Sequence, residues 1–205
     1  GPVLLPAHSI WSGLTGADPT AAIIIQDIRL PRVALSVGVG GILGLSGAAA
    51  QSLTRNPLAE PAVFGTPQAA AFGAVAVLYS GAASAFSLLL PLSAIAAAIV
   101  SLLAIIWLLR GNLNIITLLL VGLGIGSLAG AATSLVISFS ANPYAIMEIV
   151  FWLMGSFEDR SLQHVLLAYP FFALAMLLIF PCASGYQALT LGEDVAYSLG
   201  IDVNR

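Results

Sequence analysis

Ser46 lies in the sequence Gly-Leu-Ser-Gly at residues 44–47, a context similar to that of the nucleophile in intramembrane serine proteases. A serine nucleophile needs a histidine base within hydrogen-bond reach. His8 precedes the first long apolar stretch, and His164 lies at the edge of the last. Because neither histidine is expected inside the membrane beside Ser46, we interpret this sequence as small-residue helix packing and predict no catalytic residue.

Residues that bind metals, phosphates or nucleic acids are sparse. Cys182 is the single cysteine, and only two histidines accompany it, so the sequence predicts no metal site and no cofactor. The chain has no G-x-x-x-x-G-K-[ST] loop to hold the phosphates of ATP. Its six basic residues are scattered, which argues against nucleic acid as a partner. We therefore expect the chain not to be an enzyme.

The composition indicates the solvent that the chain requires. Of its 205 residues, 60% are hydrophobic and 7% are charged, whereas roughly a quarter of an average soluble domain is charged. So few charges cannot cover the surface of a soluble globule of this length. The sequence predicts an all-α, polytopic transmembrane helical bundle.

Charged residues divide the chain into apolar intervals, and about 20 apolar residues suffice for a helix to cross the hydrocarbon layer. The interval between Glu60 and Arg110 is long enough for two helices, with a turn at residues 79–85. Asn142-Pro143 disfavours continuation of the helix before it. The predicted spans are residues 33–54, 64–81, 86–109, 114–140 and 164–182.

Five spans place the two ends of the chain on opposite sides of the membrane, but the orientation stays open. Three arginines fall on each side, so the positive-inside rule does not choose between the two orientations. The chain begins without methionine or a signal peptide and stops directly after a polar segment, which we interpret as a fragment cut at both ends.

Glycines recur at fixed spacing in two of the predicted spans. Gly122, Gly126 and Gly130 lie at every fourth position of the fourth span, and Gly40 and Gly44 lie in the first. Small residues at this spacing let helix backbones approach closely. Plain helix packing is one interpretation and the lining of a wide pathway is another, and the spacing does not separate them.

No Asp, Glu, Lys, Arg or His lies in the middle of a predicted span. Ion-driven transporters place ionisable groups there despite an insertion cost of about 2.5–3.5 kcal/mol. If the chain transports a solute, the energy is expected to come from another protein.

Two polar segments join the predicted spans. Residues 55–61, RNPLAEP, join the first two and predict a short, rigid turn. Residues 147–165 are aromatic and amphipathic and predict a short helix along the membrane surface. The residues predicted to form the turn are Asn56, Pro57, Glu60 and Pro61.

The closing stretch, residues 189–205, is polar and patterned, unlike most of the sequence before it. Thr190 and Glu193 have the spacing of a capping box, and Gly200 falls where a helix C′ residue belongs. These signals predict a helix at residues 191–199.

That predicted helix has an apolar stripe at Leu191, Val195 and Leu199. A helix this short is marginal alone and needs a surface to pack against. It carries acidic rather than basic residues, which argues against anionic lipid and favours a groove on another protein.

Four separated motifs are similar to those of one family, in the same order: RLPR, RNPLAEP.VFG, FWLMGSF and LTLGEDVAYSLGI. The chain resembles the FecCD-type permeases of ABC importers for ferric siderophores, haem and cobalamin, over essentially all 205 residues. The resemblance implies a bundle of the type II ABC importer permease kind, of which this chain would cover about helices 2–6. It also implies ATPase subunits, an extracytoplasmic substrate-binding protein and a second permease chain as partners in the lipid bilayer.

The resemblance also orients the chain in the cytoplasmic, or inner, membrane. Residues 1–32 and 141–163 would lie outside the cytoplasm, and residues 183–205 would form a cytoplasmic coupling segment. The turn of Asn56, Pro57, Glu60 and Pro61 would also be cytoplasmic. Arg29 and Arg32 match arginines that dock the binding protein, although the residues alone would equally allow a helix end anchored at the headgroups. The implied ATPase-coupling residues are Leu191, Gly192, Glu193, Ala196, Leu199 and Gly200.

The expected function is therefore a permease subunit that translocates a ferric siderophore or related metal chelate, with ATP hydrolysed by separate subunits. An ion-coupled secondary transporter and a structural membrane-assembly subunit are the alternatives.

Overall fold

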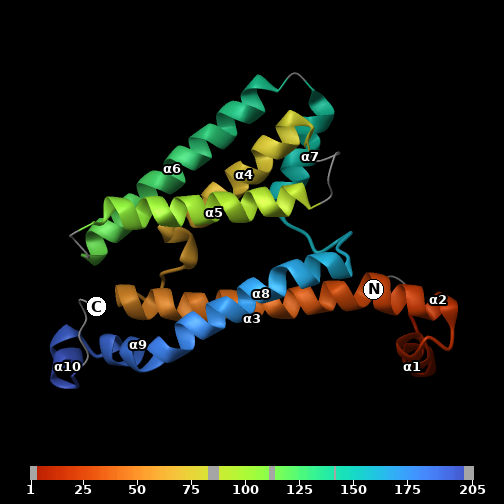
Figure 1. The fold of residues 1–205 in the computed structure, drawn as a ribbon, viewed down its shortest axis with the longest axis horizontal. Helices are drawn as coiled ribbons and strands as arrows, with labels where there is room; N and C mark the ends of the chain where they lie inside the picture. The colour runs from red at the N-terminus through yellow and green to blue at the C-terminus, as the bar shows by residue number, and fades with distance from the viewer. Residues whose placement is uncertain (1–3, 83–87, 111–113, 141, 201–205) are drawn as a thin grey trace. The chain divides into compact units, whose positions relative to one another are not determined.

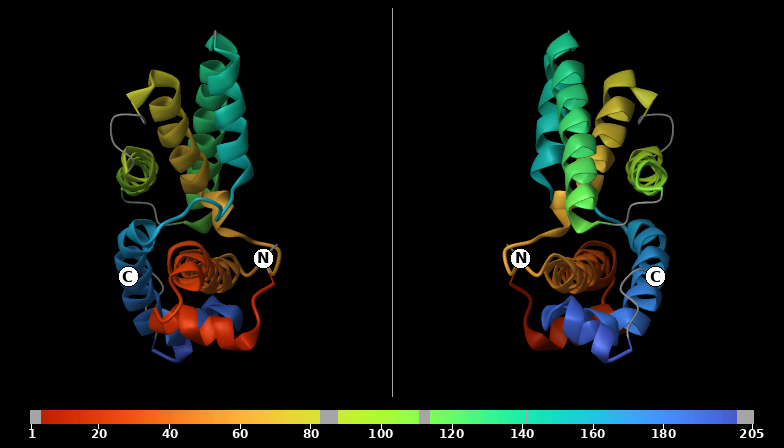
Figure 2. Two further views of the ribbon diagram at one scale, coloured as in Figure 1. Left: turned by 90° about the vertical axis from the view of Figure 1, so that its right-hand side faces the viewer. Right: turned by 90° about the vertical axis from the view of Figure 1, so that its left-hand side faces the viewer.

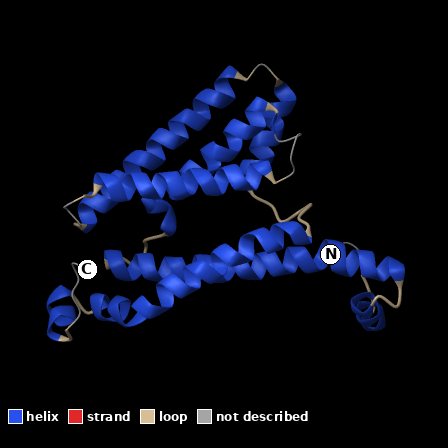
Figure 3. Ribbon diagram, in the orientation of Figure 1, coloured by secondary structure: helices blue, strands red, loops and turns tan. Residues whose placement is uncertain are grey.

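The computed structural model describes residues 4–82, 88–110, 114–140 and 142–200, and this part of the chain is helical without a strand (Figures 1 and 3). It divides into two compact units, Gly1–Leu45 with Ser156–Pro181, and Ser46–Gly155 with Cys182–Arg205. The all-α prediction is confirmed, and each unit is described below by itself.

The first unit is built on a helix that starts well before the first predicted span. Helix α2 (Pro19–Ala22), the π-helix η1 (Ile23–Arg29) and α3 (Leu30–Thr54) follow one another without a break and make 36 residues. At 1.5 Å per residue this is about 54 Å, well beyond the roughly 30 Å of a hydrocarbon core. The predicted boundary at residue 33 is therefore the edge of the uncharged stretch and not the start of the helix.

Asp18 is the reason that the helix starts where it does. Its carboxylate accepts hydrogen bonds from the backbone N–H groups of Thr20 and Ala21, at 3.0 and 3.3 Å, and Pro19 occupies the first helical turn. An aspartate N-cap followed by proline is a strong start signal. The Asp18-Pro19 pair was visible in the sequence, but the predicted spans were bounded by charged residues alone and did not use it.

Two further helices pack against this helix within the first unit. Helix α1 (Ala7–Thr15) lies against it at Gly13, whose carbonyl accepts a 2.8 Å hydrogen bond from the Gln26 side-chain amide. Helix α8 (Leu162–Ile179) runs beside α3, where the Tyr169 hydroxyl donates to the Ala34 carbonyl at 3.1 Å (Figures 1 and 2).

The second unit contains the helical bundle after the polar turn. Helix α4 (Thr66–Ser80) packs against α5 (Leu89–Leu108) and α6 (Ile115–Phe139), and α7 (Pro143–Met154) contacts α4 (Figure 1). Val75, Leu78 and Ile149 form its buried core. The Asn142 side chain accepts the Tyr144 N–H at 3.0 Å and begins α7, so the predicted break at Asn142-Pro143 is confirmed.

Short helical segments flank the bundle at its two polar connections. The 3-10 helix η2 (Pro61–Phe64) precedes α4. The 3-10 turn η4 (Phe180–Cys182) follows α8 and leads into α9 (Ala183–Thr190), after which α10 (Glu193–Ser198) closes the described chain. The end of the predicted coupling segment, residues 201–205, lies outside the described residues.

Four described helices are long and apolar enough to cross a membrane: Pro19–Thr54, Leu89–Leu108, Ile115–Phe139 and Leu162–Thr190. The second predicted span, residues 64–81, corresponds to α4, whose 15 residues extend about 22 Å. Many large apolar side chains on these helices are exposed, including Leu103, Trp107 and Leu177. A surface of this kind needs lipid or further helices as its surroundings.

Candidate functional site

The predicted coupling segment folds as two short helices separated at Gly192. Gly192 has a φ of 110°, which L-residues with side chains rarely adopt, and it stands as the residue before α10. The chain therefore turns between α9 and α10. The helix predicted at residues 191–199 is present as Glu193–Ser198, and its predicted start at Leu191 is wrong because the chain breaks at Gly192. Gly200, with a φ of 78°, follows α10 as the C′ signal predicted.

The predicted capping box at Thr190 is also wrong. Thr190 is the last residue of α9, and its hydroxyl donates to the Gln187 carbonyl at 2.6 Å, one turn back. It is therefore committed to the preceding helix and not to the start of α10. The sequence signal that could have located the break is Gly192, which begins the LGED motif.

The apolar residues of the coupling segment are nevertheless exposed. Leu191 is 67% exposed and Leu199 is 62% exposed, whereas Ala196 is fully buried. Because Leu191 precedes the break, it does not share one helix with Val195 and Leu199 as the i, i+4, i+8 spacing suggested. What the segment presents is a pair of packed short helices with large apolar side chains on the outside.

The turn at residues 55–61 is held by its own backbone and by one asparagine. The Asn56 side chain accepts the Leu58 N–H at 2.9 Å, and its carbonyl accepts the Ala59 N–H at 3.1 Å. Arg55 has a φ of 51°, which ends α3 sharply. These contacts form the short turn that the sequence predicted, and its rigidity stays a prediction.

Glu60 and Pro61 lie at the far end of that turn. Glu60 has extended backbone and immediately precedes η2, whose first residue is Pro61. A proline at the first helical position is tolerated because its missing N–H would have had no helical partner there. The turn therefore passes directly into a helical segment rather than into a longer loop.

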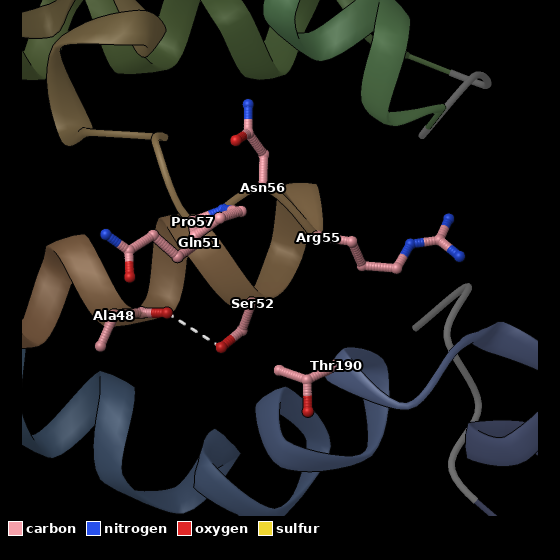
Figure 4. A pocket seen from close by; sticks show the side chains of 7 residues that line it. All are labelled: Ala48, Gln51, Ser52, Arg55, Asn56, Pro57 and Thr190. Atoms are coloured by element: carbon pink, nitrogen blue, oxygen red, sulfur yellow. Dashed lines mark hydrogen bonds between the residues drawn. The ribbon is translucent and has the colours of Figure 1, made fainter.

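The turn and the end of α9 share one pocket of about 370 Å³ (Figure 4). Figure 4 shows Asn56 and Pro57 on the turn, with Thr190 approaching from the coupling segment. The Ser52 hydroxyl donates to the Ala48 carbonyl at 2.9 Å, one turn back on α3. The spacing of residues along the chain did not predict that Thr190 and the turn border one pocket. The lining residues are Ala48, Gln51, Ser52, Arg55, Asn56, Pro57 and Thr190.

The predicted glycine sites divide into covered and open positions. Gly122 and Gly126 are buried on α6 against η2 and Gly65, which follows η2 with a φ of 73°. A Cβ at Gly65 would overlap the Gly122 carbonyl oxygen, and a Cβ at Gly126 would lie 3.0 Å from Cα of Gly65. A backbone crossing this close needs glycine on both sides.

Gly130, Gly40 and Gly44 differ from that pair. A Cβ built at any of these three would meet nothing within 4 Å. The same residue type at similar spacing is thus used for packing at one place and left uncovered at another. The structure brings Gly122 and Gly126 together with the turn, and it gives Gly40 and Gly44 no such role within the described chain.

The two arginines of the RLPR motif lie in the first unit. Arg29 closes η1 and Arg32 lies in the first turn of α3, and both are half-buried. Arg29 borders a shallow, largely apolar depression, whereas Arg32 opens onto a second hollow beside the loop that precedes α8. A role for either arginine in docking stays a prediction.

A model of the FecCD transport family matches residues 1–205 of this chain. An "Uncharacterized ABC transporter permease protein YvrB" of Bacillus subtilis (strain 168) is 35% identical over 97% of the chain and 57% of its own length. "Cobalamin import system permease protein BtuC" of Halobacterium salinarum is 33% identical over 93% of the chain and 51% of its own length.

A third relative and a solved structure agree with these. "Probable siderophore transport system permease protein YfiZ" of Bacillus subtilis (strain 168) is 35% identical over 87% of the chain and 54% of its own length. A structure described as an inward-facing conformation of a metal-chelate type ABC transporter superposes with a TM-score of 0.80 at 31% identity, over 90% of this chain and 58% of that one. The chain thus spans about half the length of the curated relatives it matches and has the helical fold of an ABC permease in the membrane.

Proposed function

This chain belongs to the FecCD transport family, and from that premise we propose that it is part of the permease subunit of an ABC importer in the cytoplasmic membrane. The proposed cargo is a ferric siderophore or a related metal chelate. The named relatives are divided between siderophore and cobalamin transport, so the chelate class is the level at which the proposal is made.

The proposed energy source is a pair of separate ATPase subunits. The long apolar helices Leu89–Leu108 and Ile115–Phe139 contain no Asp, Glu, Lys, Arg or His, and His164 is the one such residue in Leu162–Thr190, near its start. The charged residues of Pro19–Thr54 all lie before residue 33, outside the predicted span at residues 33–54. Proton- and sodium-coupled carriers place such groups within the membrane. The composition of these helices supports a transport cycle driven from outside the bilayer.

The observation that carries the proposal is the geometry of α9 and α10. Leu191 and Leu199 are exposed although Ala196 beside them is fully buried. Exposed leucines on a short helix pair are unfavourable in water unless a partner covers them. We assign this surface to a groove on the ATPase, with Gly192 and Gly200 shaping the two turns and Glu193 beginning α10.

Movement of that helix pair would reach the membrane helices through the turn at residues 55–61. Thr190 at the end of α9 and Asn56 on the turn border the same pocket. The turn is stiffened by the Asn56 hydrogen bonds and continues through η2 to the close crossing at Gly65. A stiff turn transmits displacement, whereas a flexible tether would absorb it.

The opposite end of the permease is proposed to receive the extracytoplasmic binding protein. Arg29 and Arg32 would pair there with carboxylates on that protein. Exposed ion pairs are each worth about 0–1 kcal/mol, so their main contribution is the orientation of the encounter. The open faces at Gly40 and Gly44 are proposed to meet either the pathway or a second permease chain.

Co-purification tests the coupling assignment. The full-length permease is expressed with its ATPase, and membranes are solubilised for the unmodified protein and for a variant with both Leu191→Asp and Leu199→Asp. We expect at least a tenfold loss of ATPase from the double variant, because two carboxylates would have to be desolvated in an apolar groove.

The matched control is Leu58→Asp, because Leu58 is 88% exposed on the turn assigned to the same side of the membrane. Retention of the ATPase by this control shows that an added carboxylate on that side is tolerated. If the ATPase is recovered equally with the double variant, the coupling assignment is wrong.

A further inference from the structure

The long helix Pro19–Thr54 changes its hydrogen-bond pattern between α2 and α3. The segment between them, η1, is a π-helix, and the backbone N–H of Leu30 at its end donates to the carbonyl of Ile25, five residues back. An α-helix pairs each N–H with the carbonyl four residues back. The turn at η1 therefore holds one residue more than the turns of α2 and α3 on either side.

Pro31, directly after this segment, disfavours a regular α-helix here. It is the second residue of α3 and is fully buried. In an α-helix its ring would collide with the carbonyl of Asp27, four residues before it, and it has no N–H to donate. Because Asp27 lies within η1, the pattern changes at the turn that the proline ring has to enter.

Helix α1 holds the same segment from outside. The side-chain amide of Gln26, in the middle of η1, donates to the carbonyls of Gly13 and Leu14 at 2.8 and 3.3 Å. These carbonyls belong to the last turn of α1 and have no donor within their own helix. The two bonds fix the direction in which Gln26 points from the long helix.

A close contact at Gly13 joins α1 to both sides of the junction between α2 and η1. A Cβ at Gly13 would lie 2.7 Å from the carbonyl oxygen of Ala21 and 2.8 Å from Cγ1 of Ile25. Ala21 belongs to α2 and Ile25 to η1, and both are buried. Since α1 contacts both segments, it fixes the rotation of α2 relative to η1.

We propose that α1 is a clamp, formed by Gly13, Leu14 and their contacts with Gln26, that holds residues 23–29 in the π form. When the clamp is released, this stretch takes the α pattern and turns α2 about the axis of α3 by about 100°, the rotation that one residue spans in an α-helix. The inference goes beyond the proposed function, because it needs neither a cargo nor an ATPase. A contact that displaces α1 is thereby converted into rotation between α2 and the membrane-crossing part of the same helix.

The test measures the distance between spin labels on Thr20 of α2 and Gln163 of α8, both exposed, in the full-length permease in lipid nanodiscs. The native cysteines, Cys182 among them, are replaced by serine. Gln26→Leu should raise the population of a second distance, several ångströms from the first, at least about fivefold, because two hydrogen bonds are lost. Pro31→Ala should have at least as large an effect.

Two controls accompany these variants. Gln51→Leu makes the same substitution on the exposed surface of α3, outside the clamp, and should leave the distance unchanged. A second label pair, at Val37 and Leu166, lies after Pro31 on α3 and α8, where both side chains are exposed. It should keep its distance in every variant. A shift in that pair would mean that α3 and α8 separate, which would overturn the proposal.

Deletion of Ile24 distinguishes the change of pattern from simple detachment of α1. With one residue fewer, the α pattern can join α2 and α3 without turning them, because the π-helix holds one extra residue. We expect the deletion to keep the first Thr20–Gln163 distance and to abolish the second population, also in combination with Gln26→Leu.

The proposal is wrong if Gln26→Leu and Pro31→Ala leave the distribution of distances unchanged. It is equally wrong if the deletion of Ile24 itself produces the second distance, or if the second population persists when the deletion is combined with Gln26→Leu. None of these results bears on the proposed function, whose tests follow the ATPase and the cargo.

Discussion

Gly122 and Gly126 of α6 look like Gly40 and Gly44 of α3 in the sequence, and the two pairs differ in the structure. A Cβ would lie 2.8 Å from Cα of Phe64 at Gly122 and 3.0 Å from Cα of Gly65 at Gly126, whereas a Cβ at Gly40 or Gly44 would meet nothing within 4 Å. Gly122 and Gly126 are covered by packing within the chain. The second pair is available to something outside the described residues. Spacing identifies faces that can be approached closely, and the structure shows which of them are approached.

The largest effect is expected at Gly65, where Gly65→Val would break the crossing. A β-branched residue at a φ of 73° is strained by about 1–2 kcal/mol, and its Cβ would also overlap the Gly122 carbonyl. With about 1–3 kcal/mol for overpacking, we expect a total loss of about 2–5 kcal/mol, measured by unfolding in detergent.

Gly81→Val is the matched control for that prediction. Gly81 has nearly the same backbone angles as Gly65 and no atom within 4 Å of a built Cβ. It should therefore show only the strain of about 1–2 kcal/mol. Equal losses at the two glycines would mean that the crossing with α6 contributes nothing.

A smaller effect is expected when two glycines of α6 are compared. A Cβ at Gly122 would lie 2.8 Å from Cα of Phe64, and one at Gly124 would meet nothing. Gly122→Ala should therefore destabilise the protein by about 1–3 kcal/mol. Gly124→Ala should stabilise it slightly, by up to about 1 kcal/mol, through helix propensity. Thermal unfolding of both variants checks the difference, and the opposite ranking would contradict the packing described here.

The contact between α3 and α8 in the first unit should respond more weakly. Tyr169→Phe removes the hydroxyl that donates to the Ala34 carbonyl and leaves the ring against Phe172. The loss of one hydrogen bond should cost about 0.5–1.5 kcal/mol. Urea or thermal unfolding would measure it, and a loss above about 3 kcal/mol would show that the ring itself had been displaced.

The smallest effect on stability is expected at the open face of α3. Gly44→Leu adds a side chain where nothing lies within 4 Å, so the unfolding free energy should change by less than about 1 kcal/mol. Chelate uptake by the full-length transporter should fall severalfold, because the face would no longer accept its pathway or partner. A large loss of stability, or full uptake, would contradict the assignment of this face to something outside the described chain.

The sequence predicted the helices of both units well, because apolar intervals and turn residues are local signals. Asn142 and Asn56 are examples, since each side chain accepts a backbone N–H two residues ahead. The prediction from sequence failed where one local signal was compatible with two structures. Thr190 was assigned to the helix after it and belongs to the one before, and the charges at residues 29–32 were taken for a helix end although the helix runs through them.

The remaining features depend on contacts between distant segments. Nothing in the local sequence relates Arg160 to Arg32 or Thr190 to Asn56, yet each pair borders a common pocket. The overlap at Gly65 is of the same kind, because it depends on where α6 crosses. Periodicity predicts the face of a helix and cannot predict which distant backbone lies on it.

Uptake of a radiolabelled ferric siderophore into proteoliposomes tests the central claim most directly. The full-length permease is reconstituted with its ATPase and binding protein, with ATP inside or outside and with or without an uncoupler. The account predicts uptake that requires ATP on the ATPase side together with the binding protein, and that an uncoupler leaves unchanged. Uptake that persists without the ATPase and is abolished by the uncoupler would contradict it and identify an ion-coupled carrier.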